Sequence, residues 1–267
     1  MNDDVEALGR QAERSETLDH LVRAGLVAYG VVHVLLGWLC LQLAMGDRSE
    51  DPSAAGALHT LASQPFGRTM VWAVAAGMLL LVVWRVVEAG FGHRGEGDER
   101  TRERLVSAGK AVVYGAIGLT AVKVAVGSGS GRSGGWTATV MGWPGGQWLV
   151  ALAGLGVLAY AAKLVHSGWT SGFAKDMTAR GKSGDLGTAF VLVGRVGHVG
   201  KGLSLALVGL LTVVAGVSHD PQKGGGLDQA LSQVLQEPYG AWLILVVGLG
   251  LWCFGAWCFV LVRHHDR

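Results

Sequence analysis

The chain has 267 residues, of which 50% are hydrophobic and 16% are charged, and its net charge is +2. Soluble globular domains carry about a quarter charged residues, so this composition excludes an ordinary soluble protein. The net charge is low, and the basic residues lie beside apolar runs. These two features exclude nucleic acid as the expected partner.

Six apolar runs follow one another along the chain. They cover roughly residues 24–45, 69–84, 105–126, 147–165, 190–217 and 240–262. A helix needs about 20 apolar residues to cross a hydrocarbon core about 30 Å thick, and each run is close to that length. We therefore predict an all-α integral membrane protein with six transmembrane helices. Residues 1–20 are charged, and we expect them to form a cytoplasmic N-terminal arm.

Short motifs recur along these runs. Arg23, Gly25 and Gly37 recur as Arg195, Gly197 and Gly209, and in weaker form as Arg104 and Gly118. The turn motif Pro65-Phe66-Gly67 recurs as Pro144-Gly145-Gly146 and Pro238-Tyr239-Gly240. Such internal repetition is typical of one supersecondary unit built several times. The sequence thus predicts three tandem two-helix repeats, at 21–92, 102–168 and 188–263, arranged as a bundle with pseudo-threefold symmetry.

Glycine is abundant, with 43 residues, although it is a poor helix former in water. In a membrane, small residues allow helix backbones to approach closely, which stabilises helix pairs. We therefore expect glycines at matching repeat positions to pack helices together. These are Gly37, Gly118 and Gly209 on the first helices and Gly77, Gly156 and Gly250 on the second helices.

The segments before the Pro motifs also repeat in the first and third copies. Ala57-Leu58 and Leu61 precede Pro65 as Ala230-Leu231 and Val234 precede Pro238. This spacing predicts a short amphipathic helix at the membrane surface, which the proline then ends. In the second copy, residues 127–143 are rich in Gly and Ser, so we expect this helix to be degenerate there.

Lysine and arginine are distributed unevenly between the two sides of the predicted helices. The side that holds both termini carries 15 of them, and the other side carries 4. Because basic residues concentrate in cytoplasmic loops, we expect both termini in the cytoplasm and the protein in the cytoplasmic (inner) membrane of a bacterium.

These motifs resemble a bacterial membrane family named domain of unknown function 1206 (DUF1206). The resemblance extends over about 21–262 and rests on the Arg-x-Gly opening, the Tyr29-Gly30 step, the mid-helix glycine and the Pro-x-Gly turn. It implies three tandem copies of a two-helix transmembrane domain, and it brings no activity. The second copy departs most, since Val106 replaces the first glycine and Lys110-Ala111 replaces Tyr29-Gly30.

Ionisable residues within membrane spans are costly and indicate candidate functional positions. Lys110 and Lys201 occupy matching positions, and Tyr29 takes this place in the first repeat. Each lysine could extend its side chain to the cytoplasmic headgroups, or it could form a basic pocket for an anionic lipid headgroup or small anion. His33 is the most central titratable group of the first helix. The candidate site residues are Tyr29, His33, Arg104, Lys110, Arg195, His198 and Lys201.

No catalytic or metal motif stands out. Cys40, Cys253 and Cys258 lie in the apolar runs without CxxC spacing, and Arg85 and Glu88 have the spacing of a local ion pair. We therefore predict no cofactor, no metal and a non-enzymatic protein that binds lipid or a partner. The alternatives are a small transporter or channel with a site between helices 1, 3 and 5, and a membrane enzyme. The lipid bilayer is the expected partner, with anionic lipid as a candidate; protein partners and oligomeric state stay open.

Overall fold

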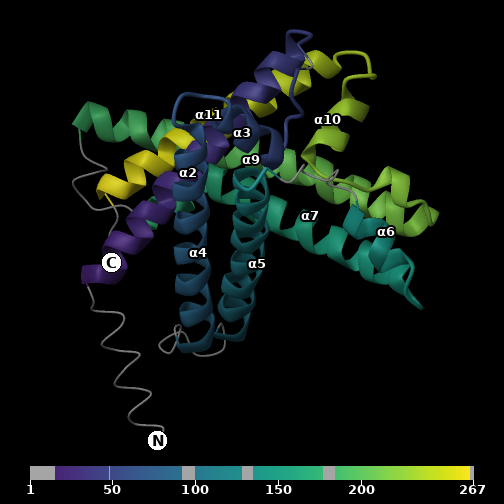
Figure 1. Ribbon diagram of the computed structural model, residues 1–267, viewed down its shortest axis with the longest axis horizontal. Coiled ribbons are helices and arrows are strands. Elements are labelled where there is room, and N and C mark those ends of the chain that lie inside the picture. The colour runs from purple at the N-terminus through teal and green to yellow at the C-terminus, as the bar shows by residue number, and fades with distance from the viewer. Residues whose placement is uncertain (1–15, 48, 92–99, 128–134, 177–183, 265–267) are drawn as a thin grey trace, which may run out of the picture. The chain divides into compact units, whose positions relative to one another are not determined.

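A computed structural model describes residues 16–47, 49–91, 100–127, 135–176 and 184–264, which are helical and contain no strand. Six of its helices are long and apolar enough to cross a membrane. These are α2 (Glu16–Ala44), α4 (Gly67–Phe91), α5 (Arg100–Ala125), α7 (Gly146–Thr170), α9 (Gly184–Ser218) and α11 (Gly240–His264), drawn in Figure 1. The all-α, six-helix prediction is confirmed. The predicted N-terminal arm lies outside the described residues, except that α2 already begins at Glu16.

Shorter helices connect the long ones. α3 (Ala54–Ala62), α6 (Gly135–Met141) and α10 (Leu227–Val234) each precede a Pro motif, so the second repeat also keeps a short helix. The 3-10 helices η2 (Gly172–Asp176) and η3 (Pro221–Lys223) follow α7 and α9. α10 is more than a surface helix, because Leu231 is fully buried and packs with Cys40, Ile244 and Leu251.

The Pro-x-Gly turn has the same geometry in all three repeats. The residue after each proline has a left-handed backbone, with φ of 61° at Phe66, 72° at Gly145 and 68° at Tyr239. The glycine that follows faces a carbonyl oxygen of the preceding short helix so closely that a Cβ would overlap it. The overlapping pairs are Gly67 with Leu61, Gly146 with Val140 and Gly240 with Val234. Glycine is required here because only hydrogen fits between the two backbones.

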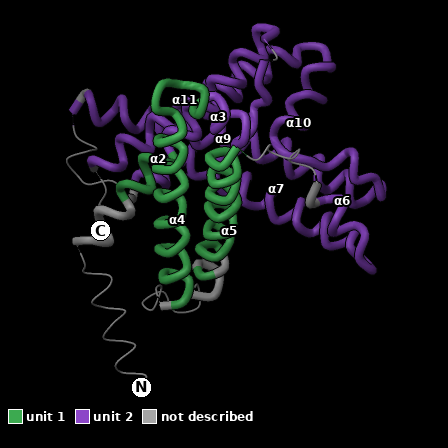
Figure 2. Tube along the Cα trace, viewed as in Figure 1, with its two compact units in different colours: residues 1–29, 61–128 green, residues 30–60, 129–267 purple. Residues whose placement is uncertain are grey.

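The chain divides into two compact units, coloured separately in Figure 2. The first unit comprises residues 1–29 and 61–128, and within it α4 and α5 lie side by side. The second unit comprises residues 30–60 and 129–267, and within it α9 packs along both α7 and α11. Helix α2 contributes its first part to the first unit and its second part to the other.

Matching glycines mediate two helix contacts of the second unit. A Cβ at Gly37 would lie 2.7 Å from the carbonyl oxygen of Gly248, and one at Gly248 would lie 3.1 Å from that of Gly37. Gly209 and Gly154 face each other in the same reciprocal way, at 3.1 and 2.9 Å. In both contacts, the first helix of one repeat packs on the second helix of another. Recurring glycines therefore build recurring contacts.

Other glycines serve the contact between the two helices of one repeat. In the first unit a Cβ at Gly77 would lie 2.7 Å from the Ala28 Cβ, and in the second unit one at Gly250 would overlap the Gly200 Cα. Gly118 instead serves a contact between two repeats, since a Cβ there would lie 3.2 Å from the Cβ of Met78 in α4. Gly156 differs from the prediction, since no described atom would come within 4 Å of a Cβ there. The arrangement of all three repeats about one axis stays a prediction.

Candidate functional site

A buried basic cluster joins α2, α9 and α11 within the second unit. Lys201 is 7% exposed and His33 is 6% exposed. The Nζ atom of Lys201 lies 3.8 Å from the centroid of the Phe254 ring, and the His33 ring lies 4.9 Å from the same ring. An ammonium group over an aromatic face is attracted by the negative face of the ring, which offsets part of its desolvation. The two central basic candidates of the sequence thus meet around one aromatic side chain.

A cavity of about 290 Å³ opens beside this cluster. Its polar lining consists of His33, Lys201, Ser204 and Ser53, and its walls are aliphatic side chains. It reaches the first residues of the two short helices α3 and α10, at Ser53-Ala54 and Gly226-Leu227. An apolar cavity with a few polar groups is the usual arrangement of a small-molecule site, in which those polar groups fix the ligand orientation.

His198 lies next to this cavity without lining it. Its Nδ1 atom is 2.8 Å from the Gly194 carbonyl oxygen, and its ring stacks on Phe173 at 4.4 Å between centroids. Trp257 contacts both rings edge-on. Phe173 comes from η2, outside every repeat motif, so the sequence offered no signal for it. His198 is therefore part of an aromatic cluster with Phe173, Trp257 and Phe254.

The leading arginines of the second and third repeats bind helix ends. The Arg104 Nη2 donates to the Gly90 carbonyl at 2.6 Å, and the Arg195 Nη2 donates to the Trp169 carbonyl at 3.3 Å. Gly90 and Trp169 occupy the same position relative to the Pro motif of their repeats. A guanidinium there satisfies carbonyls that the helix leaves unpaired and complements the negative end of its dipole. A headgroup role for these arginines stays a prediction.

A different polar cluster occupies the first unit. Arg85 and Glu88 form the ion pair that their spacing predicts. Ser107 of α5 donates to the same Glu88 carboxylate at 2.9 Å, and Lys110 is close enough to act on it electrostatically. Tyr29, the counterpart of Lys110 in the first repeat, packs edge-on against Tyr114 at 5.0 Å. Lys110 is thus placed beside an acid, whereas Lys201 is placed beside an aromatic ring and a cavity. The sequence did not single out Ser107 or link Glu88 to Lys110, because no other repeat carries an acid at that point.

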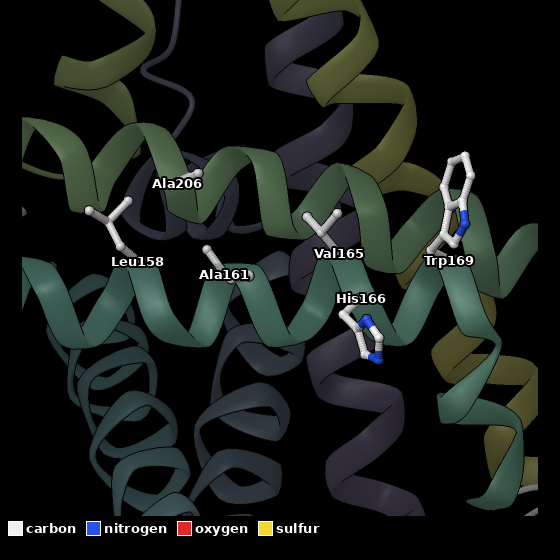
Figure 3. Close-up of a pocket in the computed structure, with 7 residues that line it drawn as sticks. Leu158, Ala161, Val165, His166, Trp169 and Ala206 are labelled. Atoms are coloured by element: carbon white, nitrogen blue, oxygen red, sulfur yellow. The ribbon is translucent and has the colours of Figure 1, made fainter.

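A wider groove of about 580 Å³ runs along α7 and α9. Figure 3 shows Leu158, Ala161 and Val165 pointing toward α9, while His166 points away from it. The groove is almost entirely apolar, as expected of a surface that faces acyl chains. The described residues also hold no group of three metal-ligating side chains. The Lys201 cavity is therefore the better candidate site.

Comparison with known proteins finds similarity in sequence without an assigned role. The family model described as Domain of Unknown Function (DUF1206) matches residues 24–92, 105–171 and 196–265. "Uncharacterized protein YxxB" of Bacillus subtilis (strain 168) is 29% identical over 238 residues, which are 87% of this chain and 86% of the Bacillus protein. No solved structure matches the chain.

Proposed function

The chain belongs to the DUF1206 family of multi-pass membrane proteins, and from the geometry of its buried basic cluster we propose that it binds an anionic, lipid-like ligand without enzymatic chemistry. The proposed site is the cavity beside Lys201 and His33. The proposal also places the protein in the cytoplasmic membrane with both termini inside, which the excess of 15 basic residues over 4 supports.

One observation carries the proposal: Lys201 is buried within a membrane-spanning helix and lines a cavity. A lysine in a membrane span is costly to keep, so such residues face cavities or partners and serve binding. An anion in the cavity would neutralise the ammonium charge in a low-dielectric environment, where their attraction is much stronger than in water. The aliphatic walls favour a ligand that also has an apolar part.

The test measures binding of anionic and zwitterionic amphiphiles to the purified protein in nanodiscs. We expect saturable binding of the anionic class, and Lys201→Met should weaken it at least tenfold. Lys123→Met is the matched control, because Lys123 is also a lysine of a spanning helix but is exposed and does not line the cavity. Equal effects of the two substitutions, or no anion preference, would refute the proposal.

A transporter is the second candidate, and the shared cavity of α2 and α9 residues favours it. The sequence suggested a site between helices 1, 3 and 5. His33 on helix 1 and Lys201 on helix 5 line one cavity, whereas Lys110 on helix 3 acts electrostatically on Glu88 within the first unit. Flux into proteoliposomes separates the candidates. A binding protein gives no anion flux above that of empty liposomes, whereas flux that Lys201→Leu abolishes and Lys110→Leu retains would establish transport through this cavity.

A further inference from the structure

The Lys201 cavity has dimensions and charge that select among anionic ligands. We propose that its ligand is a single-chain amphipathic monocarboxylate of about eight carbons. This inference rests on the proposed function and narrows it to one chemical class.

Size is the first argument. At roughly 30 Å³ for each water-sized group, the cavity of about 290 Å³ holds on the order of ten non-hydrogen atoms. It lies at the lower end of the volumes typical of small-molecule sites. A carboxylate with a short alkyl chain fills such a space, whereas the two acyl chains of a phospholipid would extend well outside it.

Charge is the second argument. Lys201 supplies one positive charge to the cavity, and the His33 ring has a nitrogen that can donate a hydrogen bond. No arginine is present among the described residues that line the cavity. Arginine is the side chain that matches phosphate bidentately, while a single ammonium matches a monoanion. A phosphate monoester carries about −1.5 to −2 charges, so it would leave uncompensated charge in an apolar site. A carboxylate is therefore the better match.

The starts of α3 and α10, which line the cavity, are the third argument. Both short helices present their N-terminal residues to the cavity, and helix N-termini attract anions. Ser53 accepts the Gly56 N–H at 3.0 Å, so the hydroxyl proton of Ser53 is not used in that bond. These N-terminal residues therefore favour an anion in the cavity beside Lys201.

The walls are the fourth argument. Leu36, Leu227 and Leu251 line the cavity between its polar ends. Burial of each CH₂ group strengthens binding roughly fourfold, so affinity should rise with chain length until the cavity is full. We expect this rise from butanoate to octanoate and no further gain with dodecanoate, apart from partition into the bilayer.

The experiment measures binding of n-alkanoates of four to twelve carbons to the full chain in phosphatidylcholine nanodiscs, with empty nanodiscs subtracted. Octanol and octylamine are the matched neutral and cationic probes. We expect saturable octanoate binding at least tenfold tighter than octanol binding, reduced tenfold or more by Lys201→Met. Leu227→Trp should block the cavity and abolish binding without removing any charge, with its melting temperature reported as the check of folding.

The outcomes distinguish the two levels of the proposal. A preference for octanoate that both variants remove supports the inference. Binding of phosphatidylglycerol that depends on Lys201, without alkanoate binding, overturns the monocarboxylate and leaves the anionic-ligand function standing. Affinity that increases continuously with chain length in Leu227→Trp also overturns it, because binding is then to the bilayer. No anion binding that depends on Lys201 overturns both.

Discussion

Two lysines at the same repeat position have different surroundings. Lys110 lies beside the Glu88 carboxylate, which also binds Arg85 and Ser107. Lys201 lies over the Phe254 ring and borders a cavity. The Glu88 carboxylate acts electrostatically on Lys110, whereas Lys201 has an aromatic ring and a cavity as neighbours. The repeat position therefore does not by itself fix the surroundings of a lysine.

Single glycines also have distinct roles. Gly250 faces the Gly200 backbone, and a Cβ there would overlap its Cα. Gly115 lies in a helix as well, but a Cβ there would meet only the Val82 side chain, at 3.9 Å. Val34 and Ala206 occupy the position of Gly115 in the other two repeats, so a side chain is tolerated there.

We predict that Gly250→Ala destabilises the protein while Gly115→Ala does not. Overpacking of this kind typically lowers the free energy of unfolding by about 1–3 kcal/mol. Alanine is the better helix former by about 1 kcal/mol, so Gly115→Ala should be neutral or stabilising. Reversible unfolding in mixed micelles measures both values. Similar shifts for the two variants would show that close approach at Gly250 does not stabilise the fold.

At the scale of the elements, arginine contacts hold helix ends together. Arg195 at the start of the third repeat binds the last turn of α7 through the Trp169 carbonyl, and its Nε donates to the Ser171 hydroxyl at 2.7 Å. Ser171 has a left-handed backbone, with φ of 57°, and ends the helix. The contact therefore fixes both where α7 ends and how α9 runs beside it. Arg104 makes the corresponding contact with α4 in the first unit.

We predict that Arg195 and Ser171 act as a coupled pair. Arg195→Gln and Ser171→Ala should each lower the free energy of unfolding by about 0.5–1.5 kcal/mol, as expected for one hydrogen bond. The double variant should lose less free energy of unfolding than the two single variants lose together, because both substitutions remove the same contact. Arg263→Gln is the control, since Arg263 is an exposed arginine near the end of α11. Additive losses would indicate that the pair is not coupled.

At the scale of the whole molecule, three two-helix repeats make up one membrane protein. Each repeat contains two spanning helices, so all three enter the membrane from the same side. The short helices α3, α6 and α10 consequently belong to one side, and both termini to the other. The basic residues concentrate on the side of the termini, which supports the proposal that this side is cytoplasmic.

We predict that a membrane-impermeant maleimide labels Gln236→Cys in intact cells and labels Thr170→Cys only after permeabilisation. Both positions are exposed, at opposite ends of the spanning helices. The background carries Ala at Cys40, Cys253 and Cys258, so that only the introduced thiol reacts. The reverse labelling pattern would invert the orientation and place the α3 and α10 end of the cavity in the cytoplasm.

The membrane class, the six spanning helices, the three repeats and the family could all be predicted from the sequence. These follow from hydropathy and from recurring spacing, which are properties of the chain read in order. It also predicted the Arg85–Glu88 pair, because residues three apart on a helix are neighbours whatever the tertiary structure.

Which candidate residues lie together depends on the packing of the helices. His33 and Lys201 are far apart in the chain, yet they line the same cavity. Arg195 and Lys201 belong to the same repeat motif, but Arg195 binds the end of α7 and Lys201 lines the cavity. Three further features likewise depend on which helices face each other. They are the stacking of Phe173 on His198, the open space at Gly156 and the hydrogen bond from Ser107 of α5 to Glu88. These surroundings are created by packing between segments that are distant in the sequence. The periodicity of one segment predicts a helix, but it does not identify the helix that packs against it.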